Sequence, residues 1–298
     1  MPLTDLIHYF NLRNREQYGP QLCPGNSLAS ISDPAGSHIV GLFATLNLDS
    51  AFQAVVDART GLVVAHEGLL RARALDGRQW APEAVFALPA DDTEVVFLDR
   101  LCRTVHALNF LLQTNTGKEG SANGDLYLNI HARHLLHVVS AHGQVFEQIL
   151  KHCGLAPQQV VFEILASTIE DNQRLGEVVS NYRQRGYRIA IDDFGREPPN
   201  FDHLWQLSPD IVKIDHALLV RAAEDIQQRL LLDKVVDIAR AMGASTVAMG
   251  IETEAQLALA REAGANQLQG FLLARPQLNC LAAGTRLCLA RPALDVAA

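Results

Sequence analysis

The sequence predicts an α/β fold of the (β/α)8-barrel type, preceded by a short N-terminal extension. Three observations support this prediction. Short apolar runs of strand length alternate with segments that carry apolar residues at three- and four-residue spacing, which is the pattern of parallel βα units. Eight such runs occur over about 250 residues, the usual length of a barrel. Polar residues recur near the ends of these runs, where the chemistry of a barrel is located.

The elements follow in order along the chain. Residues 1–40 contain prolines and glycines that interrupt any long periodicity, so we expect an irregular extension and a barrel domain over residues 41–298. The candidate strands are Phe52–Val56, Leu62–His66, Leu126–Ile130, Val160–Leu165, Arg188–Ile191, Ile211–Ile214, Thr246–Met249 and Gln267–Leu272. The candidate helices are Glu83–Leu112, Gly143–Cys153, Ile169–Arg185, Ala217–Met242 and Glu254–Ala263. No GxGxxG or GxxxxGKS loop follows any of these strands.

Composition and charge exclude several classes of function. The net charge of −8 argues against binding of a nucleic-acid polymer, which requires a concentrated Lys/Arg surface. No stretch approaches the roughly 20 apolar residues of a spanning helix, and residues 1–11 show no signal-peptide pattern, so we expect a cytoplasmic protein that does not enter a membrane. The five cysteines include no CxxC pair, which indicates neither a zinc site nor a disulfide framework.

Charged and amide side chains lie in or just after seven of the candidate strands. They are Glu67, Asn129, Glu163, Asp192, Asp193, Lys213, Glu252 and Gln269. A single residue of this kind is best interpreted as a solvated strand end or a helix cap, but their repetition indicates one shared site. Glu163 and Lys213 also lie inside apolar runs, where an unpaired charge would cost several kcal/mol.

The residue types at these positions indicate a divalent metal. Carboxylates with one amide, and without Cys or clustered His, favour Mg²⁺ or Mn²⁺ over zinc. The adjacent Asp192 and Asp193 repel each other unless a cation lies beside them. Such a site beside Lys213 suits hydrolysis of a phosphodiester, in which the lysine orients water or stabilises charge. It equally suits an enolate-forming enzyme with lysine as the base, so the residues alone leave both reactions open.

A series of motifs between Phe52 and Pro276 resembles the EAL-domain family of cyclic di-GMP phosphodiesterases, in the order and spacing of that family. The motifs are AHEGLLRAR around Glu67, LNIHARHL around Asn129, FEIL around Glu163, IDDFG at residues 191–195, DIVKID around Lys213, GIETEAQL at residues 250–257 and QGFLLARP at residues 269–276. The resemblance implies a modified TIM-type (β/α)8 barrel. It also implies the family reaction, hydrolysis of one phosphodiester of cyclic di-GMP to give linear pGpG.

The resemblance implies a role for each matching residue. Four residues would be ligands of a first metal ion, and one would serve a second: these are Glu67, Asn129, Glu163 and Asp192, followed by Asp193. The catalytic candidates are Lys213, which would orient the attacking water, Gln269, which would support the pocket, and Glu252 in the seventh-strand motif. The residues expected to contact guanine and phosphate of the dinucleotide are Gln53, Leu69 and Arg71.

Three departures from the family pattern indicate a degenerate member. The seventh-strand motif Glu-Gly-Val-Glu-Thr begins here with Met249, and a thioether cannot replace a carboxylate on Mg²⁺. The family's Thr-Gly-Tyr-Ser-Ser loop is replaced by residues 196–200, in which two prolines fix φ and remove amide donors. The glutamate that anchors this loop in the family is Ala166 here. We therefore expect the second metal to be lost and the first-metal ligands to be retained.

These expectations define a leading hypothesis and two alternatives. The leading hypothesis is a signalling module that binds cyclic di-GMP at a Mg²⁺ or Mn²⁺ site and has weak or no phosphodiesterase activity. The first alternative is an active phosphodiesterase in which Glu252 or Glu197 substitutes for the missing ligand. The second is a domain that binds no dinucleotide and acts through protein contacts. The resemblance also implies a homodimer or a signalling-protein partner.

Overall fold

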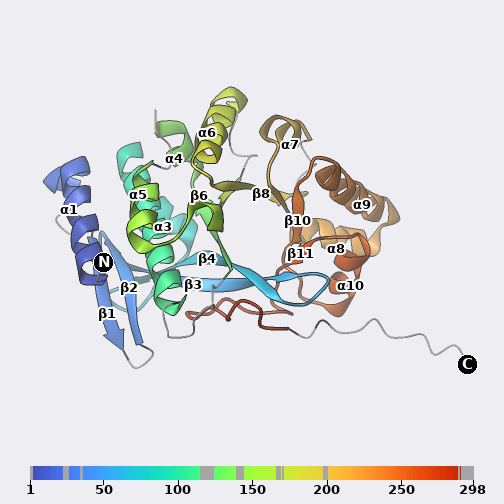
Figure 1. Cartoon of the computed structure of the whole chain (residues 1–298), viewed down its shortest axis with the longest axis horizontal. Coiled ribbons are helices and arrows are strands. Elements are labelled where there is room, and N and C mark those ends of the chain that lie inside the picture. Colours follow the sequence, from blue (N-terminus) through green and yellow to red (C-terminus); the bar gives the residue numbers. More distant parts are fainter. Residues whose placement is uncertain are drawn as a thin grey trace, which may run out of the picture.

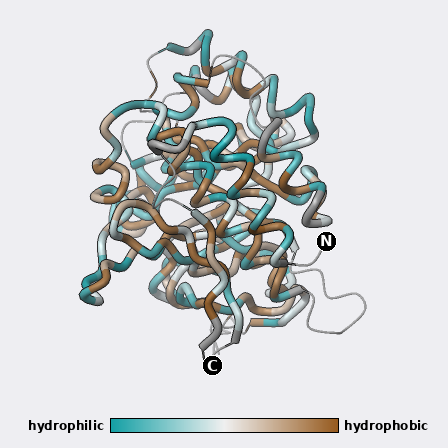
Figure 2. The backbone as a smooth tube through the Cα atoms, turned by 90° about the vertical axis from the view of Figure 1, so that its left-hand side faces the viewer, coloured by the Kyte–Doolittle hydropathy of each residue, from teal (hydrophilic) through white to brown (hydrophobic). Residues whose placement is uncertain are grey.

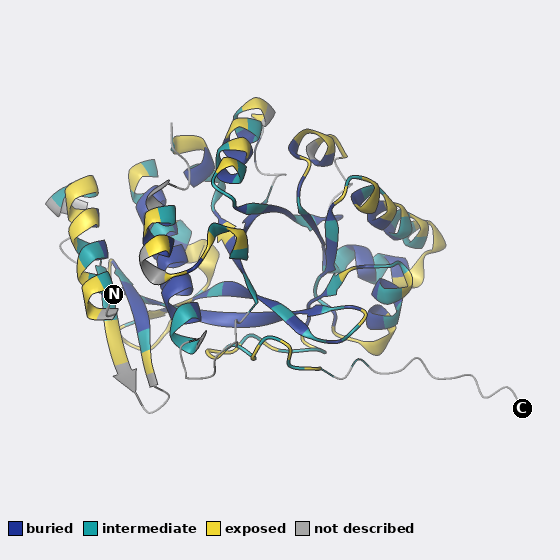
Figure 3. Cartoon of the chain, viewed as in Figure 1, coloured by how far each residue is buried: buried dark blue, intermediate teal, exposed yellow. Residues whose placement is uncertain are grey.

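The computed structural model confirms the predicted α/β barrel. It describes residues 3–22, 27–33, 36–114, 124–138, 144–165, 169, 171–196, 201–287 and 289. Eight strands close into a ring, with helices around most of its circumference (Figure 1). The helices turn buried residues toward the strands and exposed residues outward (Figure 3). This arrangement places the ends of the strands around one central opening.

The strands of the ring follow a mixed topology. In spatial order they are β3 (Leu46–Asp57), β11 (Gln267–Leu268), β10 (Ser245–Ala248), β9 (Ile211–Ile214), β8 (Arg188–Phe194), β7 (Val160–Ile164), β6 (Asp125–Ile130) and β4 (Val63–Ala74). Strand β3 is antiparallel to both of its neighbours, β4 and β11, and every other neighbouring pair is parallel. This reversed strand modifies the all-parallel (β/α)8 arrangement.

Helices link most of the parallel strands. They are α2 (Pro82–Phe86), α3 (Asp92–Thr114), α4 (Ala132–His137), α5 (Gln144–Cys153), α6 (Asn172–Gln184), α7 (Phe201–Leu207), α8 (His216–Glu224), α9 (Ile226–Ala241) and α10 (Glu254–Glu262), with a short 3-10 helix (Pro157–Gln159) before β7 and a short strand β5 (Gln79–Trp80) beside β4. Brown and teal residues alternate along the helices in Figure 2, as expected for helices with one face on the core.

Two long helices expected from the sequence are each divided in the structure. The predicted helix at residues 83–112 forms α2 and α3. The predicted helix at residues 217–242 is interrupted at Asp225, whose backbone is extended (φ −130°, ψ 122°). The Asp225 carboxylate accepts a hydrogen bond of 2.7 Å from the Gln227 N–H and so caps α9. A local cap therefore overrides the continuous apolar periodicity.

The interior of the barrel is filled by side chains. A layer of apolar residues from the strands packs there: Val55, Ala65, Tyr127, Val161, Ala190, Ile211 and Val247, with Met249 against them. A larger apolar cluster lies between the strands and the helices. Among the described residues, this apolar layer fills the barrel below the carboxyl ends of its strands.

The N-terminal region corrects one prediction. An irregular extension was expected before residue 41, but the described part of it forms helix α1 (Leu3–Leu22) and the hairpin of β1 (Ser27–Asp33) and β2 (Gly36–Phe43), which extends the sheet from β3. The Asn11 side chain holds α1 to the hairpin through both backbone groups of Leu28, at 2.8 and 3.0 Å. Tertiary contacts thus give regular secondary structure to a segment in which the prolines predicted irregular structure. The domain boundary at residue 40 stays a prediction.

The described helices have a further property in common. None of them combines the length and the apolar character that a membrane span requires.

Candidate functional site

A cavity of about 260 Å³ opens at the mouth of the barrel. Residues from six parts of the chain line it, from β3 and β4 through β8 and β9 to the segments that follow β10 and β11. They are Gln53, Glu67, Leu69, Asp192, Asp193, Lys213, Met249, Gly250, Glu252, Gln269, Gly270 and Phe271. Eight of the eleven residues predicted for the site from the sequence are in this lining, so the carboxyl ends of the strands converge as expected.

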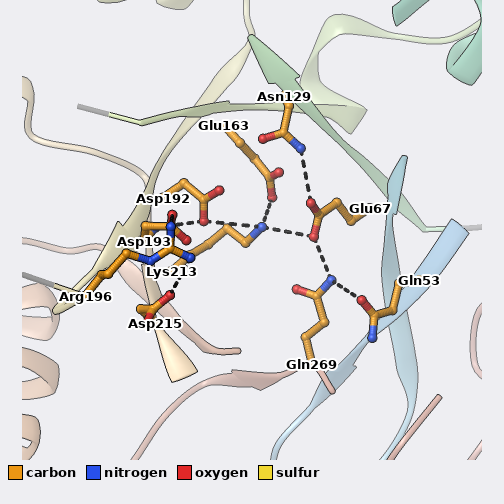
Figure 4. A network of polar contacts seen from close by, with 10 residues as sticks. All are labelled: Gln53, Glu67, Asn129, Glu163, Asp192, Asp193, Arg196, Lys213, Asp215 and Gln269. Carbon is orange, nitrogen blue, oxygen red and sulfur yellow. Dashed lines mark hydrogen bonds and ion pairs between the residues drawn. The ribbon is translucent and has the colours of Figure 1, made fainter. Parts of the chain in front are cut away.

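Lys213, in β9, lies at the centre of the polar network at this mouth (Figure 4). Its side chain is only 1% exposed. Its Nζ lies 3.1 Å from Glu67 Oε2 and 3.6 Å from Asp192 Oδ1, and it also donates to Glu163 Oε1. Burial alone would lower the pKa of Lys213, but the three carboxylates outweigh it and hold this pKa well above its usual value. The lysine is therefore charged.

Two side-chain amides fix the orientation of Glu67. Asn129 Nδ2 donates to Glu67 Oε1 at 3.1 Å, and Gln269 Nε2 donates to Glu67 Oε2 at 2.7 Å. Gln269 Nε2 also lies 3.3 Å from Gln53 Oε1. Burial would raise the pKa of Glu67, but the Lys213 charge and the amide hydrogen bond lower it below its usual value. Glu67 is thus the ionised partner of the lysine.

Glu163 and Asp192 carry more negative charge than the lysine can offset. The carboxylate of Glu163, in β7, is fully buried, and its Oε2 receives no hydrogen bond from the described residues. Burial and the neighbouring Glu67 raise the pKa of Glu163 well above its usual value. Burial also raises the pKa of Asp192, against the effect of Lys213. A proton or a further cation is therefore favoured at this position.

Asp193 follows at the end of β8 in an unusual conformation. Its φ is 54°, in the left-handed region that Asp tolerates better than most residues. Its N–H donates to Asp192 Oδ1 at 2.9 Å. Burial and the Asp192 charge raise the pKa of Asp193 to about 6. Its Oδ2 pairs with Arg196 at 2.7 Å, and Arg196 also contacts Asp215 at 3.3 Å. The Asp193 carboxylate thus has a cationic partner of its own, Arg196.

Other predicted residues surround this network. Leu69 lines the cavity from β4. Arg71, two residues further along the same strand, is exposed and donates to the Leu70 carbonyl at 2.9 Å. It does not line the cavity. Glu252 lies exposed at the rim, after β10. Met249 lines the cavity from the apolar layer below.

Sequence patterns did not indicate the roles of Arg196 and Asp215. They mark Arg196 only as part of an altered loop, and Asp215 only as the last residue of the DIVKID motif. A signal is nevertheless present, since Arg196 lies three residues after Asp193 and Asp215 two residues after Lys213. Two other features, Ala166 and residues 197–200, lie outside the described residues.

The donor set has the chemistry that a hard divalent ion requires, although its carboxylates surround an ammonium group. Within the described ranges, no three His, Cys, Asp or Glu side chains are arranged around a single metal position. The carboxylates of Glu67, Glu163 and Asp192 instead converge on the Lys213 ammonium. Their oxygens, the Asn129 amide and Glu163 Oε2, which has no hydrogen-bond partner among the described residues, fit Mg²⁺ or Mn²⁺ in donor chemistry.

The fold and the site together define the class of protein: a mixed eight-stranded barrel with a carboxylate-lined mouth. The family model of the EAL domain matches residues 42–276. The chain therefore belongs to the EAL domain family, and the resemblance carried by the motifs is confirmed. Several of its homologues are named as cyclic di-GMP phosphodiesterases.

Curated relatives cover different parts of the chain. An uncharacterised protein of Azorhizobium caulinodans is 30% identical over 236 residues, which are 78% of this chain and 31% of that protein. The probable cyclic di-GMP phosphodiesterase PdeA of Escherichia coli is 33% identical over 131 residues, which are 44% of this chain and 18% of that protein. The chain thus spans less than a third of the length of these two relatives.

Solved structures match the barrel. The Bacillus subtilis YkuI protein, solved with its substrate cyclic di-GMP and calcium, is 27% identical with a TM-score of 0.66, over 79% of this chain and 57% of that one. A standalone EAL protein of Vibrio cholerae, solved with bound cyclic di-GMP, gives a TM-score of 0.68 at 20% identity, over 80% of this chain and 97% of that one. The second likeness shows the fold alone.

Proposed function

We propose that this EAL domain binds cyclic di-GMP at one divalent-metal site, with weak or no phosphodiesterase activity. The observation that carries the proposal is the convergence of Glu67, Glu163 and Asp192 at the barrel mouth, beside the thioether of Met249. The YkuI complex with cyclic di-GMP and calcium supports both the ligand and a divalent ion.

The residues of the proposed first-metal site have two roles, metal coordination and the positioning of the ligating side chains. Oxygens of Glu67, Asn129, Glu163 and Asp192 would hold a Mg²⁺ or Mn²⁺ ion. When bound, the ion offsets the charge of these carboxylates and of a phosphate on the ligand. Lys213 keeps Glu67 and Glu163 in place and would orient a water molecule near the phosphate.

Three other residues are proposed to contact the dinucleotide. Leu69 offers an apolar surface at the cavity wall, and Gln53, which pairs with Glu67 across β3 and β4, lines the same cavity. Arg71 is on the same face of β4 as Leu69 and is an exposed residue. Arginine is well suited to a phosphate because it presents a planar fork of donors.

The proposed loss of turnover rests on Met249, which lines the cavity. Met249 stands where the family has a carboxylate, and its side chain packs on the apolar layer of the barrel. A thioether supplies no hard oxygen for a second ion. A second ion normally stabilises the attacking or leaving oxygen, so its loss removes much of the catalytic rate without removing the first-metal ligands.

A paired measurement tests this proposal. Calorimetry with cyclic di-GMP and Mn²⁺ should show binding, and chromatography of the same sample should show little or no pGpG. Glu163→Gln should abolish binding, whereas Glu262→Gln, on an exposed residue of α10, serves as the matched control and should not change it. Absence of heat at high micromolar ligand would refute the binding proposal.

One observation favours the runner-up, an active phosphodiesterase. Glu252 lines the same cavity as Asp192 and Asp193 and has an exposed carboxylate. It could supply the oxygen that Met249 lacks. Rapid, Mn²⁺-dependent formation of pGpG that both Glu67→Ala and Glu252→Gln abolish would establish this alternative in place of the leading one.

A protein partner or a homodimer is also proposed. Helix α7, which follows the altered loop, exposes two large apolar side chains, Phe201 at 37% and Trp205 at 78%. Exposed aromatic residues are enriched at protein interfaces. Light scattering should report a dimer that Trp205→Gln dissociates. A monomer in both proteins, together with Arg71→Ala leaving ligand binding and cellular output unchanged, would favour a partner-only role.

A further inference from the structure

Arg196 is held over Asp193 by a tight turn at the end of β8. The Arg196 N–H donates to the Asp193 carbonyl at 3.2 Å, which closes the turn. Gly195 has φ 92°, and a Cβ at this position would lie 2.8 Å from Leu218 Cδ2. The backbone therefore requires glycine here, and it directs the next side chain back toward the barrel mouth.

The guanidinium bridges two largely buried carboxylates. Arg196 Nη1 lies 2.7 Å from Asp193 Oδ2, and Nη2 lies 3.3 Å from Asp215 Oδ2, as Figure 4 shows. The two carboxylates are 18% and 8% exposed. Arginine is suited to this geometry because its charge is permanent and its donors form a planar fork.

Asp215 is pre-positioned for this contact. Its Oδ1 accepts the Ala217 N–H at 2.7 Å and caps α8, which leaves Oδ2 directed at Arg196. The pairing therefore joins the end of β8 to the start of α8. Arg196 itself is 61% exposed, so it lies at the rim and can be reached from solvent.

A second divalent ion does not fit the side chains at this position. Asp193 is the residue that the family pattern assigns to such an ion, and here a guanidinium already neutralises it. Met249 supplies a thioether in place of the other oxygen. A second ion would therefore lack both the free negative charge of Asp193, which Arg196 offsets, and a hard oxygen at position 249.

We propose that Arg196 replaces the second divalent cation, so that its guanidinium occupies the Asp193 carboxylate and limits the chain to one bound ion. This inference rests on the proposed function for the first ion. It adds that Met249 alone does not explain the loss of the second ion, because a carboxylate restored at position 249 would leave Asp193 still paired with Arg196.

The number of bound Mn²⁺ ions tests the inference without reference to activity. Equilibrium dialysis with electron paramagnetic resonance counts the ions on wild type, Met249→Glu, Arg196→Ala and the double variant. We expect no gain over wild type in either single variant and a further ion in the double variant. Arg229→Ala combined with Met249→Glu is the matched control and should gain none, since Arg229 pairs with the remote Glu262.

Each result decides the inference. A further ion on Met249→Glu alone would overturn it, because Arg196 would then not block the position. No further ion on a folded double variant would overturn it as well. If Arg196→Ala prevents folding, Arg196→Gln in the Met249→Glu background replaces it. A wild-type protein that binds no ion would contradict the proposed function. The role of Arg196 is judged separately, from the difference in the number of bound ions between the double variant and Met249→Glu alone.

Discussion

At the scale of single residues, the site is a buried lysine with too many acidic neighbours. Lys213 offsets one charge, yet Glu67, Glu163 and Asp192 all point at its ammonium. The remaining negative charge is met by a raised pKa of Glu163 and by the amides around Glu67. This arrangement is consistent with the proposed site, in which a divalent cation would take the place of a proton.

Removing the lysine charge should destabilise the metal-free protein. We expect Lys213→Met to lower the free energy of unfolding by about 3–5 kcal/mol, because it leaves buried carboxylates without their cation. Added Mn²⁺ should recover part of this loss by binding the same carboxylates. Urea unfolding with and without Mn²⁺ measures both effects. Lys234→Met, on an exposed lysine of α9, is the control; an equal loss in both variants would contradict this account.

At the scale of elements, two loops at the mouth are locked together. The Ile251 N–H, after β10, donates to the Gln269 carbonyl at 3.0 Å, and the Leu272 N–H donates to the Ile251 carbonyl at 3.0 Å. Gly270 lies between these bonds, and a Cβ there would lie 2.1 Å from Ile251 O. The contact between backbones fixes the positions of both Gln269 and Glu252.

Gly270→Ala should therefore disrupt stability and ligand binding together. The added methyl group forces the two backbones apart, at a cost of about 1–3 kcal/mol or more in the free energy of unfolding. Urea unfolding and cyclic di-GMP calorimetry check the two effects. Gly176→Ala, in helix α6 with no atom near its added Cβ, is the control and should be neutral or stabilising. Unchanged binding by a folded Gly270→Ala protein would show that the contact does not position the site.

The elements also show which structural features sequence patterns could predict. For seven of the eight candidate strands, an apolar run with a polar residue near its end is enough to predict the strand. The connection at residues 58–62 is too short to contain a helix, which is why β3 and β4 pair antiparallel. The break at Asp225 and the order of α1 depended on a cap and on contacts with Leu28. The cap is a local polar interaction and the Leu28 contacts are tertiary, so the spacing of apolar residues predicts neither of them.

For the candidate site, sequence patterns predict which residues take part better than they predict the geometry. Residues at strand ends must meet in a barrel, so the strand pattern by itself groups Glu67, Glu163 and Lys213 at one mouth. The pattern does not predict that the lysine takes the shared position, nor that Arg196 reaches Asp215, because both depend on side-chain directions across different strands.

At the scale of the whole molecule, buried histidines make stability depend on pH. Burial lowers the pKa of His106 and of His134 to about 4, so the folded state keeps them neutral where the unfolded chain takes up protons. The free energy of unfolding should fall as the pH drops from about 6.5 toward 4, by about 2 kcal/mol per histidine at pH 5.

The histidine contribution can be separated from that of the acidic site. The raised pKa values of Glu163 and Asp192 act in the opposite sense, since their protonation stabilises the fold as the pH falls. The acidic site contributes equally to the wild type and to His134→Gln, so its contribution cancels when the unfolding free energies of the two proteins are compared. The difference in unfolding free energy between the two proteins should shrink on acidification, and a difference that stays constant from pH 7 to pH 5 would contradict the prediction.

In the proposed function, acidic and amide oxygens from successive strands bind a divalent ion that recruits cyclic di-GMP. Calorimetric titration of wild-type protein with cyclic di-GMP, in Mn²⁺ and then in a chelator, tests it most directly. We expect saturable binding in Mn²⁺ that the chelator abolishes or strongly weakens. Equal affinity in both conditions, or no binding in either, would contradict it.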